Sequence, residues 1–150
     1  MSSKVLILNG PNLNMLGTRE VEIYGSDTLA DIEAKVRARA DDYAMEIDFR
    51  QSNSEAELVD WIQQARGSFN GIIINAGAYT HTSIAILDAL TMVDMPIIEV
   101  HLSNIFGREH FRKESFISSA ANGLIIGFGG TGYILALEAM SELTQAGVKI

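Results

Sequence analysis

Three short segments of the sequence combine amide, imidazole, phenol and guanidinium side chains, and each segment lies at the end of an apolar run. The side chains are Asn9, Asn12, Arg19 and Tyr24; then Asn75, Tyr79 and His81; then Glu99, His101, Ser103, Arg108 and Arg112. Histidine can act as an acid or base near neutral pH, amides donate hydrogen bonds to a developing oxyanion, and arginines bind carboxylates. These residue types favour acid–base chemistry on a small acidic molecule.

Arg19 and Tyr24 lie five residues apart in the connection after the first apolar run. This connection is much longer than the usual two to six residues of a β-to-α turn, which favours a functional loop. An unperturbed tyrosine phenol, with a pKa of about 10, is only about 0.1% ionised at pH 7, and a close guanidinium favours the ionised form. A surface loop whose Arg and Tyr merely cover apolar neighbours gives the same pattern, so the segment alone leaves both interpretations open.

The elements that position these side chains alternate between strand and helix. Apolar runs of strand type cover residues 4–8, about 45–50, 71–75, 97–102 and 123–128, and helical patterns cover about 28–43, 54–67, 83–93 and 131–146, with a short turn near 108–114. This alternation predicts a parallel sheet with helices on both faces. Five strands favour a flavodoxin-like, doubly wound α/β fold with strand order 2-1-3-4-5 and three α/β/α layers, formed by residues 1–150 as a single domain.

In such a sheet, ligands bind beyond the carboxyl ends of the strands, near the point where the strand order reverses. Two of the three histidines, His81 and His101, fall on this edge, whereas His110 lies among charged residues and is expected to be solvated. Each candidate also has a plainer interpretation. His101 could be a core histidine bonded to Glu99, His81 could cap a helix, and Asn75 could form a turn. Only the group as a whole predicts a site.

Composition excludes several classes of function. The net charge of −8 and pI near 4.7 argue against nucleic acid and anionic membrane surfaces as partners. Without cysteine, thiolate catalysis and Cys-based zinc sites are impossible. No apolar run approaches the roughly 20 residues that span a bilayer, and the first residues lack the features of a signal peptide. We therefore expect a cytoplasmic protein.

The segment 127–132 matches G-x-G-x-x-G between a predicted strand and a predicted helix. It follows the last strand, and a ribose-binding acid about 20 residues further on would lie beyond the last residue, so we expect a tight turn. A nucleotide- or flavin-binding module is the alternative function that this loop supports. His81, Glu99 and His101 could in principle bind a metal, but no paired-ligand helix motif supports this, and we expect neither a metal nor a cofactor.

The predicted helix at 83–93 is apolar nearly all round, with Asp88 as its only charge. A helix without a solvated face lies in a core or at a subunit interface, and a small doubly wound domain leaves each helix an outer face. This pattern favours a homo-oligomer, in which Asp88 could be structural or could reach a neighbour's site.

Several blocks of the sequence resemble the type II 3-dehydroquinate dehydratases over nearly the whole chain. The blocks are Asn9-Gly10-Pro11-Asn12-Leu13-Asn14, Leu16-Gly17-x-Arg19-Glu20, Tyr24-Gly25, residues 74–83 and Glu99-Val100-His101-Leu102-Ser103-Asn104. The resemblance implies a cofactor-free enzyme that converts 3-dehydroquinate to 3-dehydroshikimate in the shikimate pathway. It also implies a flavodoxin-like protomer in a dodecamer, a tetramer of trimers.

The resemblance assigns four catalytic residues. Tyr24 is implied to be the base that removes the C2 proton, and Arg19, in a mobile lid at about 17–25, keeps it ionised. Asn12 is implied to help hold the water that stabilises the enolate, and His101 to protonate the departing hydroxyl. The substrate-binding residues that it implies are Asn75, His81, Leu102, Ser103, Arg112 and, from an adjacent subunit, Asp88. Val21 stands where many relatives carry proline.

Overall fold

The computed structural model describes residues 2–18 and 20–146. Its centre is a five-stranded sheet in which every neighbouring pair is parallel and the order is β2-β1-β3-β4-β5. The strands are β1 (Ser3–Asn9), β2 (Met45–Gln51), β3 (Gly71–Asn75), β4 (Ile97–His101) and β5 (Gly123–Ile126). The predicted strand order and fold class are therefore confirmed.

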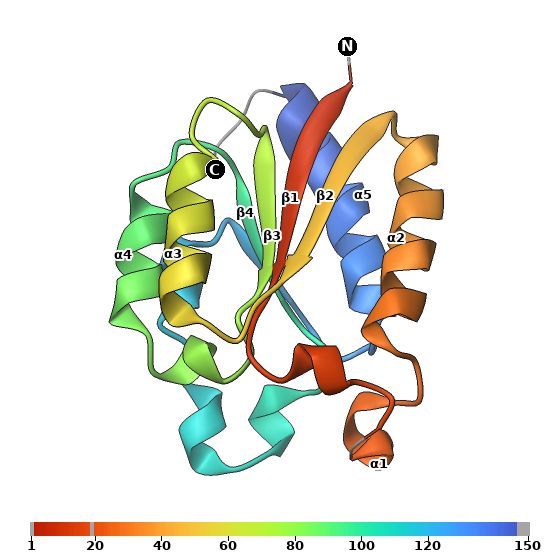
Figure 1. Ribbon diagram of the computed structural model, residues 1–150, viewed down its shortest axis with the longest axis vertical. Coiled ribbons are helices and arrows are strands. Elements are labelled where there is room, and N and C mark those ends of the chain that lie inside the picture. Colours follow the sequence, from red (N-terminus) through yellow and green to blue (C-terminus); the bar gives the residue numbers. More distant parts are fainter. Residues whose placement is uncertain (1, 19, 147–150) are drawn as a thin grey trace.

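Helices cover both faces of the sheet (Figure 1). On one face lie α2 (Leu29–Asp42) and α5 (Thr131–Ala146), and on the other lie α3 (Glu55–Gln64) and α4 (Ile84–Thr91). Two separate apolar clusters fill the layers between the sheet and these helix pairs. The central strands β1, β3 and β4 contribute to both clusters, which explains why their sequences are almost continuously apolar.

Side-chain caps fix where the helices begin. Thr28 and Asp31 form the predicted capping box at the start of α2, and Ser54 Oγ accepts from the Glu57 N–H at 3.1 Å at the start of α3. Ser83 Oγ accepts from the Ile86 N–H at 2.9 Å and so caps α4. Because Ser83 is the cap, the interpretation of His81 as a helix cap is wrong.

Two predicted strands end earlier than expected, at His101 and Ile126. The backbone turns sharply after β5, where Gly127, Phe128 and Gly129 have φ values of 87°, 66° and 56°. A left-handed conformation cannot continue a strand. The glycine-rich segment is thus the tight turn that was expected, and it leads directly into α5.

The chain passes very closely across the point where the strand order reverses. The Gly10 N–H donates to the Asn75 carbonyl at 2.8 Å, and a Cβ at Gly10 would lie 2.2 Å from the Ala76 oxygen. Only glycine permits this approach. It brings the loop after β1 directly against the loop after β3.

The loops that follow β1, β3 and β4 gather at one end of the molecule, at the bottom of Figure 1. They carry short 3-10 turns at Leu13–Met15, Gly77–His81, Ile105–Gly107 and His110–Lys113, and a further turn, Ile117–Ala120, precedes β5. The short turn expected near 108–114 is thus present. The sequence did not predict α1 (Val21–Tyr24), a four-residue helix inside the expected lid segment. Among the described residues, no helix combines the length and the apolar character that a membrane span requires.

Candidate active site

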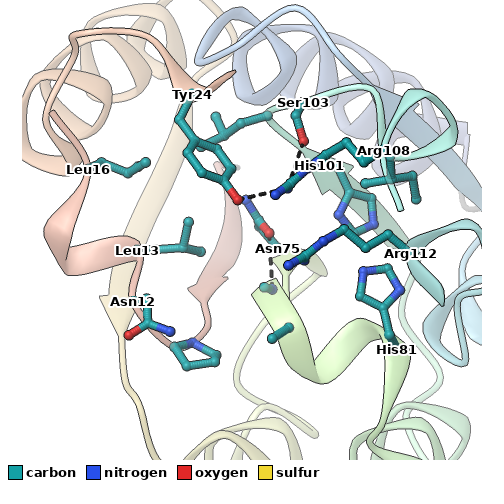
Figure 2. Close-up of a pocket in the computed structure, with 15 residues that line it drawn as sticks. Asn12, Leu13, Leu16, Tyr24, Asn75, His81, His101, Ser103, Arg108 and Arg112 are labelled. Atoms are coloured by element: carbon teal, nitrogen blue, oxygen red, sulfur yellow. Dashed lines mark hydrogen bonds between the residues drawn. The ribbon is translucent and has the colours of Figure 1, made fainter. Parts of the chain in front are cut away.

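A cavity opens at the carboxyl edge of the sheet, among the loops after β1, β3 and β4 (Figure 2). It collects most of the predicted site residues from three distant parts of the sequence. Those that line it are Asn12, Tyr24, Asn75, His81, His101, Leu102, Ser103 and Arg112, together with Arg108. These predicted residues therefore line one cavity at the edge of the sheet to which strand order pointed.

Tyr24 and Arg108 form a close polar contact at the cavity (Figure 2). Arg108 Nη1 donates to Tyr24 Oη at 2.7 Å, and the guanidinium carbon lies 5.2 Å from the centre of the tyrosine ring. The same Nη1 lies 3.5 Å from Ser103 Oγ. A guanidinium this close favours negative charge on the phenol oxygen.

His101 contacts a buried carboxylate at the end of β4. Its Nε2 is hydrogen-bonded to Glu99 Oε2, and both side chains are almost fully buried. Glu99 also accepts from Ser115 Oγ at 2.9 Å and from Ser118 Oγ at 2.7 Å. Burial alone would raise the pKa of Glu99, but the bond from His101, its charge and the two serine hydroxyls together lower it.

The contact with Glu99 partly confirms the plainer interpretation of His101, because the imidazole is indeed a buried histidine bonded to this carboxylate. It lines the cavity as well, so the two interpretations are compatible. A carboxylate on one ring nitrogen orients the imidazole and leaves Nδ1 as the nitrogen that can meet a ligand. The arrangement suits a general acid held in a fixed position.

His81 lies beside His101, with the two ring centres 6.4 Å apart, and is held by the backbone. Its Nδ1 lies 2.6 Å from the Glu114 carbonyl oxygen, which can only accept, so Nδ1 carries the proton. Burial lowers the pKa of His81, with a smaller contribution from the charges of His101 and Arg112, and the bond to Glu114 only partly offsets this. The ring is therefore neutral at pH 7, and its Nε2 is an acceptor.

Asn75 ends β3, with only 3% of its surface exposed. Its Oδ1 accepts from the Gly77 N–H at 3.2 Å, which confirms the turn-forming interpretation, and its Nδ2 donates to Tyr133 Oη at 3.1 Å. Asn12 lies at the exposed rim in a left-handed conformation, with φ of 69°. The Asn53 side chain accepts from the Asn12 backbone N–H at 3.0 Å, and Asn12 lines the cavity.

One described residue of the predicted site is not brought together with the rest. Asp88 is exposed on α4 and does not line the cavity of its own chain, so its role across a subunit boundary stays a prediction. Arg19 lies outside the described residues. Arg112 lines the cavity, and its Nε donates to Glu109 at 2.7 Å.

Sequence reasoning placed Arg108 among the candidate residues but missed its contact with Tyr24, and it missed Tyr133 altogether. Arg108 stands in a loop after β4, and a loop arginine in a chain with only seven arginines was a usable signal. Tyr133 faces the sheet from α5, and its distance of 58 residues from Asn75 gave no signal at all. Among the residues described, no group of three or more His, Asp and Glu side chains could hold a metal ion.

Fold and cavity together define a class: flavodoxin-like α/β proteins with a polar cavity at the point where the strand order reverses. Residues 3–141 match the family model described as Dehydroquinase class II. The chain belongs to this family.

Relatives agree over almost the full length. A 3-dehydroquinate dehydratase from Dinoroseobacter shibae is 55% identical over 143 residues, which are 95% of each chain. The 3-dehydroquinate dehydratase 2 of Pseudomonas aeruginosa is 53% identical over 97% of this chain and 99% of its own. The crystal structure of type II dehydroquinase from Propionibacterium acnes superposes with a TM-score of 0.91 at 42% identity, and covers 95% of this chain and 98% of its own.

Proposed function

We propose that this protein dehydrates 3-dehydroquinate to 3-dehydroshikimate by acid–base catalysis, as its family membership suggests. The observation that carries the proposal is the position of Arg108 Nη1, 2.7 Å from the oxygen of Tyr24, in the same cavity as His101. One group is thereby suited to take a proton and the other to give one.

In the proposed first step, Tyr24 acts as the phenolate and removes a proton from C2 of the substrate. The C–H electrons move into the ring and the carbonyl oxygen becomes an enolate. Arg108 stabilises the charge on the phenolate before the transfer, and Arg19 is proposed to do the same from the lid. A water held by Asn12 donates to the enolate oxygen, since preorganised donors are what such an oxyanion needs.

In the second step, the enolate collapses and expels the C1 hydroxyl, while His101 protonates the departing oxygen so that it leaves as water. Hydroxide is a poor leaving group, and an imidazolium is a suitable acid near neutral pH. The ionised Glu99, hydrogen-bonded to Nε2, holds the ring in position for this transfer. The proton taken by Tyr24 then returns to His101, directly or by exchange through solvent, which restores both groups.

The other lining residues bind the substrate. Ser103, with the backbone at Leu102, is proposed to bind the carboxylate close to Arg108, whose guanidinium lies 3.5 Å from Ser103 Oγ. Asn75, His81 and Arg112 are proposed to bind the hydroxyl groups. An amide donor and a neutral imidazole acceptor together match a hydroxyl, which both accepts and donates.

The proposal extends to an oligomer. On α4, Ile84 is 57% exposed and Met92, just after the helix, is 50% exposed, and the exposed Asp88 lies between them in the sequence. An apolar surface of this kind is typical of a subunit interface. We propose a dodecamer, a tetramer of trimers, in which Asp88 reaches the cavity of a neighbouring subunit, and we propose that the enzyme works in the cytoplasm.

The test is an absorbance assay with purified protein, 3-dehydroquinate and a chelator. The product is a conjugated enone, so ultraviolet absorbance should rise, and no rise would contradict the proposal. Tyr24→Phe should keep the fold and remove nearly all turnover. Tyr43→Phe is the matched control, because Tyr43 packs against the core at the far end of α2. Wild-type rates in Tyr24→Phe would refute the assignment of the base.

A further inference from the structure

Behind the cavity wall, a fully buried tyrosine joins three elements of the fold. Tyr133 lies on α5, and its hydroxyl donates to Asn9 Oδ1, at the end of β1, at 2.6 Å. The same oxygen accepts from Asn75 Nδ2, at the end of β3, at 3.1 Å. Asn9 does not line the cavity, whereas Asn75 does.

These side chains form a chain of hydrogen bonds that ends at a backbone group on each side. The two backbone groups determine which atom donates and which accepts in every bond of the chain. At one end Asn9 faces the Arg50 carbonyl at 3.0 Å, which can only accept, so the facing atom is the Asn9 nitrogen. Its oxygen then faces Tyr133 and forces the phenol to donate. The phenol has a single hydrogen, so it can only accept from Asn75, whose facing atom must be nitrogen.

The other end gives the same answer independently. The Gly77 N–H can only donate, so the Asn75 atom that faces it at 3.2 Å must be oxygen. Burial raises the pKa of Tyr133, so its hydroxyl keeps its proton and the direction does not reverse with pH. The amide orientation of Asn75 therefore follows from backbone chemistry at both ends.

We propose that Tyr133 is a positioning residue, which locks the Asn75 amide so that its second N–H faces the ligand as a donor. The proposal rests on the proposed function for the identity of the ligand. Asn75 then selects an acceptor oxygen on the substrate, and His81 offers an acceptor in the same cavity. Without the phenol hydroxyl, the amide is held at its oxygen alone, by the Gly77 N–H, and its nitrogen loses the acceptor that fixes its position.

The first test compares kinetic constants. Tyr133→Phe should raise the KM for 3-dehydroquinate about 10-fold, the effect expected for one lost hydrogen bond, with a change in kcat of less than about 3-fold. Tyr43→Phe, which removes a phenol hydroxyl from the same core layer, should leave both constants unchanged. An unchanged KM in a folded Tyr133→Phe protein overturns the proposal.

A double-mutant cycle separates positioning from general damage. If Tyr133 acts through Asn75, the effect of Tyr133→Phe on KM should vanish in an Asn75→Ala background. Equal factors in both backgrounds would mean that the substitution merely disturbs the fold, and would refute the proposal. Asn9→Leu breaks the chain at the far end and should also raise KM, which provides the same test if Tyr133→Phe does not fold.

A measurement without substrate separates this proposal from the proposed function. In protein labelled with 15N-asparagine, the Asn75 side-chain signals, assigned with Asn75→Ala, should include one proton shifted downfield by its bond to Tyr133. That proton should move upfield in Tyr133→Phe and stay in place in Tyr43→Phe. A wild type without dehydratase activity would refute the function alone, whereas an unmoved proton would refute the positioning role.

Discussion

Replacing Arg108 with glutamine tests whether a guanidinium sets the charge of the proposed base. Glutamine has a shorter side chain that still carries a hydrogen-bond donor, but it removes the positive charge beside Tyr24. Arg108 is suited to this test because only 14% of its side chain is exposed, so water screens its charge weakly. We expect Arg108→Gln to reduce kcat while the fold and the assembly persist.

The magnitude follows from the contact between Arg108 and Tyr24. At 2.7 Å, two unit charges attract by up to about 6 kcal/mol at an effective dielectric constant of about 20. Measured hydrogen bonds to charged groups contribute less, about 1.5–3 kcal/mol. Arg108 also pairs with the Glu109 carboxylate at 3.8 Å, which reduces its effect on Tyr24. We therefore use the range measured for hydrogen bonds to charged groups. A loss of about 2–3 kcal/mol corresponds to a decrease in kcat of roughly 30- to 150-fold.

The assay is the rise in ultraviolet absorbance on saturation with 3-dehydroquinate. Arg66→Gln is the matched control, because Arg66 is exposed beyond the end of α3 and does not line the cavity. Arg108→Lys keeps the charge without the fork geometry and should lie between wild type and Arg108→Gln. Added guanidinium should partly restore Arg108→Gln and have no such effect on Tyr24→Phe.

A decrease of less than about threefold in kcat of Arg108→Gln, with normal unfolding and normal assembly, would refute this reasoning. So would equal rates in Arg108→Lys and Arg108→Gln, because charge would then be irrelevant. An increase in KM alone would mean that Arg108 binds the substrate and does not act on Tyr24.

Three further predictions concern pH and packing. The pKa of Glu99 is lower in the folded protein than its unfolded value of 4.5, so its ionised carboxylate contributes fully to the free energy of unfolding above pH 4.5. That contribution is lost as the pH falls through the folded pKa, and Glu99→Gln should therefore flatten the acid side of a plot of unfolding free energy against pH. Burial lowers the pKa of His81 below 6.5, so its Nε2 is still an acceptor at pH 7. The KM should rise only as the pH falls below that lowered pKa, and a His81→Gln variant should not show this rise in KM at acid pH. Gly10→Ala places a Cβ 2.2 Å from a backbone oxygen and should cost roughly 3 kcal/mol or more, a decrease in Tm of about 6–12 °C by calorimetry, whereas Gly107→Ala, with its nearest neighbour at 3.6 Å, should be nearly neutral.

The sequence predicted the sheet well because burial on both faces leaves a strong pattern. The strands β1, β3 and β4 must be apolar throughout, and that requirement is visible without a structure. The helix α1 was not predicted because it has almost nothing to bury: Val21, Glu22 and Ile23 are all exposed. Periodicity reports packing, so a short helix held by its loop leaves no periodic signal.

The candidate site was predictable to the extent that strand order determines which loops meet. Strand order placed His81 and His101 on one edge, and the structure confirms that both line the same cavity. It could not determine which arginine meets Tyr24, because loop geometry decides that contact. Asp88 shows a second limit of prediction from the sequence. It is proposed to act in a neighbouring subunit, and the structure of one chain cannot show which residues it would meet there.

The cavity gains fixed polarity from the backbone groups that hold its side chains. The Glu114 carbonyl makes His81 an acceptor on its inner side, and the Gly77 N–H, with the chain through Tyr133, makes Asn75 a donor. Neither side chain has to reorganise when a ligand arrives, which is how preorganised polar sites lower a barrier. Backbone groups cannot exchange donor for acceptor. A substitution of Tyr133, which links Asn75 to Asn9 by hydrogen bonds, should therefore change substrate binding although Tyr133 does not line the cavity.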